Sequence, residues 1–119
     1  MMLGVMQMNE KAVVDAIKVL VFKYKQFEET KDKQYIKVKK NAVQGILQMQ
    51  GISYNKYRQS KNAFMVKYAQ WVKEDKYYIY IDKRLVDAWG KQMQQHTYTL
   101  TSEEEQILNA SMEGGENGV

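Results

Sequence analysis

The chain has 119 residues and a formal net charge of +4, and it contains neither cysteine nor proline. This length corresponds to one domain with a modest core, and the lack of cysteine excludes disulfides and thiolate metal sites. The charge is uneven. Residues 102–119 carry five glutamates and no lysine or arginine, which leaves 18 basic and 9 acidic residues, a net charge of +9, over residues 1–101. A body this basic is attracted to polyanions.

The sequence gives no sign of a membrane segment. Its start, MMLGVMQMNE, is apolar but lacks the positive region of a signal peptide. The longest apolar run, Val19 to Phe22, is far too short to span a bilayer. We therefore expect no membrane partner and a location in the cytoplasm or at the nucleoid.

Residues 10–28 are predicted to form a helix, because apolar side chains recur there at helical spacing and Asn9 suits the N-cap position. The apolar face is wide, so we expect this helix to be central to the core or partly buried against another chain. Residues 29–34 form a polar connection, and the alternation in Tyr35–Val38 predicts a short strand.

The segment 41–62, NAVQGILQMQGISYNKYRQSKN, has the pattern of two helices joined by a tight turn. We predict that Asn41 caps the first helix and that Gly51 takes the left-handed position that ends it. Ser53 is then the N-cap of a second helix, which runs from Tyr54 to about Gln70.

Beyond this segment the periodicity changes to that of strands. Residues 76–81 are β-branched and aromatic and predict a strand. Asp82 suits the cap of a short helix, and the alternating residues 96–101 are a second strand candidate. A capping box predicts a last helix over roughly 103–112, and the Gly-rich acidic tail 113–119 is predicted to be disordered.

Two pairings of the strand Tyr77–Ile81 remain open. In one, it pairs with residues 71–73 across a turn at 74–76. In the other, it pairs with residues 96–101, and residues 82–95 form an insertion that contains a helix. The acidic residues Glu74 and Asp75 argue against the first pairing if this turn contacts DNA.

The order helix, short strand, helix, tight turn, helix, strand, strand resembles the winged helix-turn-helix family of DNA-binding domains over roughly residues 10–101. The resemblance depends on the turn Gly51-Ile52-Ser53, on the basic polar helix after it, and on the β-prone segments that follow. It implies an α+β, mainly helical fold with a short β-hairpin, formed by residues 1–112.

The second helix of this motif carries side-chain types that recognise bases. Asn55, Arg58, Gln59 and Asn62 are spaced to project along one side of the helix. Arginine binds guanine bidentately, and asparagine or glutamine binds adenine, with about 1–3 kcal/mol of discrimination for each pair. A solvated polar helix face is the alternative interpretation.

Other residues of the motif suit the phosphate backbone. Ser53 and Tyr54 stand at a helix N-terminus, where N–H groups favour phosphate. Lysines in and around the motif add affinity without sequence information. The predicted DNA-binding residues are Lys39, Lys40, Ser53, Tyr54, Asn55, Lys56, Arg58, Gln59, Lys61, Asn62, Lys73 and Lys76.

The nine tyrosines allow two interpretations. The alternation in 77–81 places Tyr78 and Tyr80 on one face, where exposed rings would stack on unpaired bases. We favour the alternative, in which these tyrosines pack against a neighbouring helix with their hydroxyls at the surface.

No enzymatic activity, metal or cofactor is expected. His96 is the only histidine, and no metal-binding, phosphate-loop or nucleophile motif is present. The sequence favours specific binding of double-stranded DNA by a homodimer, as a small transcriptional regulator or as an accessory protein for plasmid or viral DNA processing. The alternative is a protein–protein adaptor that uses the same fold.

Overall fold

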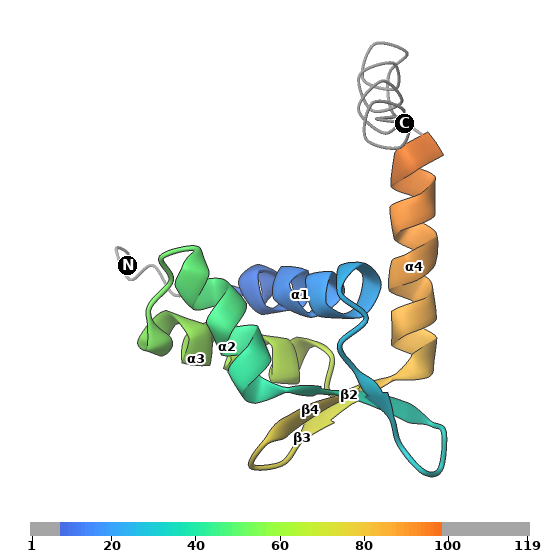
Figure 1. The fold of residues 1–119 in the computed structure, drawn as a ribbon, viewed down its shortest axis with the longest axis horizontal. Helices are drawn as coiled ribbons and strands as arrows, with labels where there is room; N and C mark the ends of the chain where they lie inside the picture. Colours follow the sequence, from blue (N-terminus) through green and yellow to red (C-terminus); the bar gives the residue numbers. More distant parts are fainter. Residues whose placement is uncertain (1–7, 99–119) are drawn as a thin grey trace. The chain divides into compact units, whose positions relative to one another are not determined.

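The computed structural model describes residues 8–98 and confirms the expected α+β class. Its elements follow one another as helix, π-helical turn, two strands, two helices and two strands, with a further helix at the end (Figure 1). They are α1 (Lys11–Lys18), the π-helical turn η1 (Val19–Lys23), β1 (Glu28–Glu29), β2 (Tyr35–Lys39), α2 (Lys40–Met49), α3 (Tyr54–Lys67), β3 (Val72–Glu74), β4 (Tyr78–Asp82) and α4 (Lys83–Tyr98).

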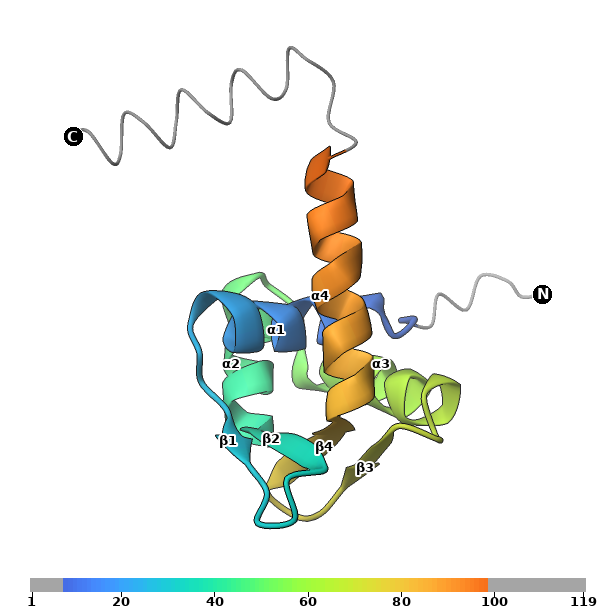
Figure 2. The same cartoon turned by 90° about the vertical axis from the view of Figure 1, so that its right-hand side faces the viewer.

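The chain divides into two compact units, one up to Asp87 and one from Ala88. The first unit contains every element from α1 to β4, and α4 runs from it into the second unit. In the first unit α1, α2 and α3 lie on one face of a four-stranded antiparallel sheet (Figures 1 and 2). The strand order is β1-β2-β4-β3.

The two faces of the sheet have opposite character because side chains alternate along a strand. Ile36 and Val38 of β2, and Ile79 and Ile81 of β4, are buried on the face that the helices cover. Their neighbours in sequence point to the other side. The core therefore lies between the sheet and the three helices.

The hairpin pairing between β3 and β4 confirms the first of the two predicted registers. Val72 pairs with Ile81 and Lys73 with Tyr80. The second register is wrong, because β2 and β3 occupy both edges of β4. The strand predicted over 96–101 is also wrong where it is described, since 96–98 belong to α4; the rest of it, the helix 103–112 and the tail 113–119 lie outside the described residues.

The first helix is shorter than predicted. Instead of continuing to residue 28, the α-helix ends at Lys18 and is followed by η1, which ends at Lys23. Lys25 then adopts a left-handed backbone with φ of 55°, which turns the chain toward β1. At the other end, the predicted N-cap is displaced by one residue: the N-cap is Glu10, whose side chain makes no capping bond, and the Asn9 side chain before it accepts a hydrogen bond from the Lys11 amide at 2.9 Å.

The turn between α2 and α3 forms as the sequence predicts. Gly51 has φ of +80°, and its N–H donates to the Gln48 carbonyl at 3.0 Å, while the Ile52 N–H donates to the Leu47 carbonyl at 2.9 Å. This pair of bonds is the Schellman ending of a helix.

The predicted cap of α2 is wrong. The helix begins at Lys40, one residue before Asn41, and its N-cap is Lys39, whose side chain makes no capping bond. The Lys40 N–H instead donates to the Tyr77 carbonyl at 2.9 Å. The first N–H group of α2 is thus satisfied by the Tyr77 carbonyl of the β3–β4 hairpin and not by a capping side chain.

Two glycines in this motif give a matched test. An alanine at Gly51 has free space for its Cβ but must keep a left-handed backbone, which costs about 1–2 kcal/mol. An alanine at Gly45, inside α2 and equally free of contacts, is expected to stabilise the fold by about 0.5–1 kcal/mol. Urea denaturation of the two variants measures both free energies of unfolding. If both substitutions change the free energy of unfolding equally, the left-handed backbone assigned to Gly51 is contradicted.

Candidate nucleic-acid interface

Helix α3 begins where the sequence predicts. Ser53 is its N-cap, and the Ser53 hydroxyl oxygen accepts a hydrogen bond from the Lys56 amide at 3.2 Å. The helix ends at Lys67, three residues before the predicted end at Gln70. It is therefore a rod of 14 residues whose first turns carry the predicted base-contacting side chains.

One side of α3 is fixed in the core by three buried residues, Tyr57, Ser60 and Phe64. The fully buried Ser60 hydroxyl accepts a hydrogen bond from the Val13 amide, in the first turn of α1, at 3.1 Å. Burial raises the pKa of the Tyr57 phenol to about 12, so this ring stays neutral. The contacts fix the rotation of α3 about its axis.

The opposite side of α3 is exposed and polar. Asn55, Arg58 and Asn62 lie on it, and within residues 8–98 no ion pair or hydrogen bond of the described structure occupies their side chains. Gln59 is also exposed, but its amide oxygen accepts a hydrogen bond from the Met8 N–H at 3.2 Å. Gln59 therefore contacts the segment before α1, whereas the other three project outward.

Two predicted phosphate-binding lysines have an internal partner. Lys40 and Lys61 place their ammonium groups 2.6 and 2.8 Å from the same oxygen of Glu74. Their side chains are only 19% and 16% exposed. These ion pairs tie α2 and α3 to β3.

The carboxylate of Glu74 is held in its charged form by these lysines. Partial burial alone would raise its pKa, but the hydrogen bonds from Lys40 and Lys61 outweigh that effect and lower it. Asp75 is also used internally: its side chain accepts from the Tyr77 and Tyr78 amides at 2.9 and 2.8 Å. Glu74 is thus paired with cations, whereas Asp75 is exposed and keeps its negative charge.

The other predicted residues lie in three places: at the start of α3, at the start of α2 and on the sheet. Tyr54 and Lys56 are exposed at the start of α3, and the Tyr54 ring lies 5.8 Å from that of Tyr57. Lys39 and Lys76 line a hollow of about 220 Å³ at the start of α2. Lys73 is separate from both groups, since it lies on the face of the sheet that α1–α3 leave open.

Sequence reasoning missed Asn41 and Tyr77, which line the same hollow as Lys39 and Lys76. Asn41 was expected to cap α2, yet its place there leaves the side chain at the surface. Tyr77 lies at the hairpin, 64% exposed. Asn41 and Tyr77 are brought together by contacts between distant segments, such as the bond from the Lys40 N–H to the Tyr77 carbonyl. No local sequence pattern predicts such a contact.

Comparison with family models, with curated proteins and with solved structures found no match to this chain. In the part of the chain that the structure describes, no three His, Cys, Asp or Glu side chains are grouped so that they could hold a metal ion. Within the same part, every helix is too short or too polar to cross a bilayer.

The Glu74 cluster predicts a pH-dependent stability. Because the folded pKa lies below the ordinary value of 4.5, the cluster stabilises the fold above about pH 4.5, and the contribution is lost as the pH falls through the lowered pKa. Replacing Glu74 by Gln should cost about 1–2 kcal/mol at pH 7. Denaturation of both proteins from pH 7 to 3 should show this difference shrinking, and a constant difference would contradict the account.

Proposed function

We propose that this protein binds double-stranded DNA in a sequence-specific manner as a winged helix-turn-helix domain, with α3 in the major groove and the β3–β4 hairpin as the wing. The observation that carries the proposal is the outward, unoccupied placement of Asn55, Arg58 and Asn62 on a helix whose other side is fixed in the core. The order of elements and the sheet order β2-β4-β3 are compatible with that family.

The proposed roles follow from side-chain chemistry. Arg58 donates two hydrogen bonds to the O6 and N7 of a guanine, and Asn55 and Asn62 bind adenine edges. Ser53 and Tyr54, at the helix N-terminus, and Lys56 next to them contact phosphates, which position the helix without selecting a sequence.

A second set of contacts is proposed where α2 meets the hairpin. Lys39 and Lys76, with Asn41 and Tyr77, surround a hollow that suits the sugar-phosphate backbone. In the sequence, Glu74 and Asp75 argued against DNA binding at this hairpin. In the structure both carboxylates have partners within the fold. Glu74 is paired with the partly buried Lys40 and Lys61, and Asp75 accepts the hydrogen bonds that build the turn.

Arg58 and Lys56 should differ in the kind of binding they support. Replacing Arg58 by Ala is expected to weaken binding to a selected duplex by about 1–3 kcal/mol and to relax preference at one base pair. Replacing Lys56 by Ala should weaken binding to all duplexes alike and reduce the slope of log affinity against log salt by about 1. Fluorescence anisotropy with specific and random duplexes measures both effects.

Lys31, exposed in the connection between β1 and β2, supplies the control. Replacing it by Ala removes the same charge as the Lys56 variant but should leave sequence preference unchanged. If both α3 variants bind a selected duplex as tightly as the original protein, α3 is not the DNA-contacting helix.

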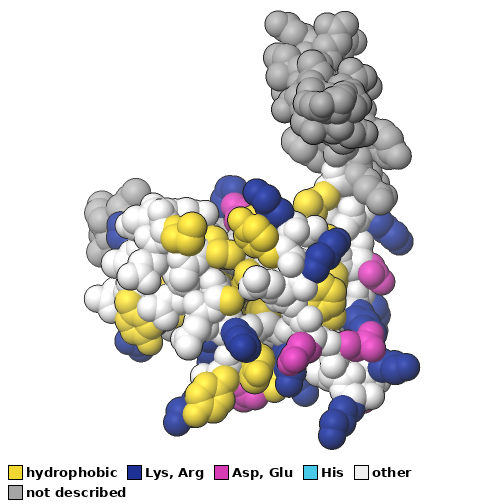
Figure 3. Space-filling model, in the orientation of Figure 1, with side chains coloured by type: hydrophobic (Ala, Val, Ile, Leu, Met, Phe, Trp, Pro, Cys, Tyr) yellow, Lys and Arg dark blue, Asp and Glu magenta, His cyan; other side chains and the backbone are white. Residues whose placement is uncertain are grey.

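We further propose that the protein acts as a homodimer, as a small regulator or as a plasmid or viral accessory protein in the cytoplasm or at the nucleoid. Figure 3 shows hydrophobic side chains gathered over the face formed by α1 and α2. An open groove between η1 and α2 contributes to this face, and Tyr24 and Met49 in it are 53% and 88% exposed. The same groove is the observation that favours the alternative, a protein–protein adaptor.

The groove gives a test of the dimer. Replacing Met49 by Glu places a charge on an apolar surface, so sedimentation equilibrium should show a dimer for the original protein and a monomer for the variant. Replacing Lys31 by Gln changes the net charge by the same amount and should leave the dimer intact. Failure of any duplex to bind even at low salt, where phosphate contacts are strongest, would favour the adaptor.

A further inference from the structure

The face of the sheet opposite α1–α3 carries alternating aromatic and cationic side chains. We call it the outer face; Figures 1 and 2 show that α1, α2 and α3 all lie on the other side of the strands. Its members come from β2, β3 and β4. They are Tyr35, Lys37, Lys39, Lys73, Tyr78 and Tyr80.

The strand register orders these residues into rows. Tyr80 pairs with Lys37 of β2 on one side and with Lys73 of β3 on the other, so its ring is flanked by two cations across the sheet. In the next row Lys39 pairs with Tyr78. The outer face therefore has the regular interleaving of rings and positive charges that the pleat imposes on an alternating sequence.

The contacts within this face are between rings and ammonium groups. The Lys37 Nζ lies 4.4 Å from the centre of the Tyr78 ring, and the Lys73 Nζ lies 4.5 and 5.6 Å from the centres of the Tyr35 and Tyr80 rings. The Tyr78 and Tyr80 rings are 6.3 Å apart. All three rings are partly exposed, and lysine ammonium groups lie over them.

The acids near the outer face are occupied. Glu28 lies 3.7 Å from Lys37, Asp75 accepts the Tyr80 hydroxyl proton in a hydrogen bond of 2.6 Å, and the buried Asp82 is bound by Arg84 at 2.9 Å. The bond from Arg84 is the largest cause that lowers the pKa of Asp82, to about 2. Asp75 and Glu28 thus hold the neighbouring Tyr80 and Lys37 side chains, whereas Lys39 and Lys73 of this face take part in no ion pair of the described residues.

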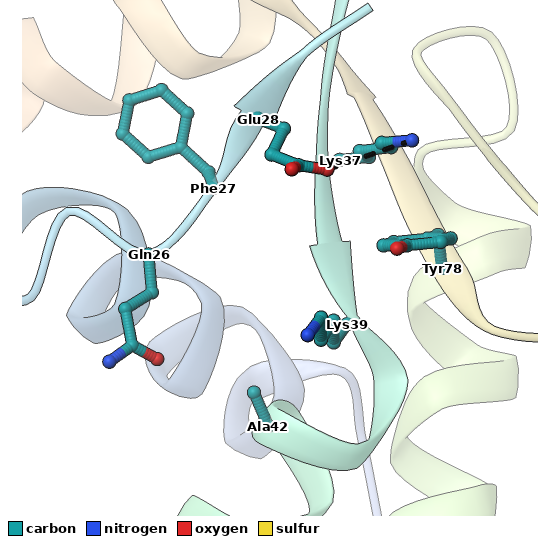
Figure 4. Close-up of a pocket in the computed structure, with 7 residues that line it drawn as sticks. All are labelled: Gln26, Phe27, Glu28, Lys37, Lys39, Ala42 and Tyr78. Atoms are coloured by element: carbon teal, nitrogen blue, oxygen red, sulfur yellow. Dashed lines mark ion pairs between the residues drawn. The ribbon is translucent and has the colours of Figure 1, made fainter.

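A hollow of about 240 Å³ adjoins the outer face at the edge of β2. Figure 4 shows Phe27 and Tyr78 on opposite sides of β2, with Lys37 and Lys39 between them. Phe27 is 39% exposed there, although it precedes a strand and is apolar. The hollow thus combines two aromatic rings and two ammonium groups with the Glu28 carboxylate, which is paired with Lys37.

We propose that the outer face binds single-stranded nucleic acid, with unpaired bases stacked on Tyr35, Tyr78 and Tyr80 and with phosphates at Lys37, Lys39 and Lys73. Aromatic rings offer stacking surface to any base, and the lysines follow the backbone. A duplex cannot stack on these rings, because its bases already stack on one another and expose only their edges and the phosphates. The proposal rests on residues that do not belong to α3, although Lys39 and Tyr78 also line the hollow proposed for the duplex backbone.

The test compares oligo(dT) and oligo(rU) with a blunt hairpin duplex, using the full chain at low salt and fluorescence anisotropy. The double variant Tyr78→Leu, Tyr80→Leu should bind both single strands at least about fivefold more weakly. Its affinity for the duplex should fall less, because Tyr78 is only one of the residues that line the hollow proposed for the duplex backbone. Replacement of the same two residues by Phe keeps the rings and should keep single-strand affinity, which separates stacking from a change in folding.

A charge variant and a crosslink complete the experiment. Replacing Lys37 and Lys73 by Gln should weaken single-strand binding and flatten its salt dependence, whereas Lys31→Gln should do neither. Ultraviolet crosslinking to an oligonucleotide that contains 5-iodouracil should attach to peptides of β2 or β4. Equal affinity for DNA and RNA strands fits stacking alone, and a preference for RNA would indicate an added contact to the 2′-hydroxyl; both support the site.

The proposal is overturned if the original protein does not bind oligo(dT) or oligo(rU) at low salt, or if the Leu variant binds them equally well. It is also overturned if the crosslink attaches to α3. Failure of duplex binding is a different result: Arg58→Ala should reduce duplex affinity and leave single-strand affinity intact, so each proposal stands or falls by its own ligand.

Discussion

The structure depends most on the burial of one side of α3 against α1. Tyr57, Ser60 and Phe64 occupy successive turns of that side, and the Ser60 hydroxyl accepts the Val13 amide in the first turn of α1. A buried polar atom that pairs with a free helix N–H satisfies both groups and permits a single rotation of α3. The exposure of Asn55, Arg58 and Asn62 on the opposite side of α3 follows from that rotation.

A second constraint joins the hairpin to the helices through charge. Glu74 of β3 receives lysines from α2 and α3, and the Lys40 amide is bound to the Tyr77 carbonyl. Partly buried charges of this kind are useful only when they are paired, so the cluster fixes the hairpin beside the start of α2. As a result the Glu74 carboxylate is paired within the fold, and Lys39 and Lys76 remain at the surface.

Local signals in the sequence were sufficient for the elements whose ends are set by their own residues. Gly51 and Ser53 defined the turn before α3, because a left-handed backbone and a capping hydroxyl are properties of single residues. The early end of the first helix, the start of α2 and the partners of Lys40 and Lys61 were not predicted. Each depends on a contact between distant segments. The alternation in β4 did place Tyr78 and Tyr80 on one face, but only the pairing with β2 and β3 revealed that lysines flank them.

The two proposed binding surfaces lie on α3, for duplex DNA, and on the outer face of the sheet, for single strands. The central claim is that α3 binds duplex DNA. The most direct test is a nitrogen-15 NMR titration of the full chain with a duplex selected from a random pool. The account predicts that the side-chain signals of Asn55, Arg58 and Asn62 shift with the amides of the first turns of α3, while the amides of β1 do not. Shifts that leave α3 unchanged and appear on other elements would contradict it.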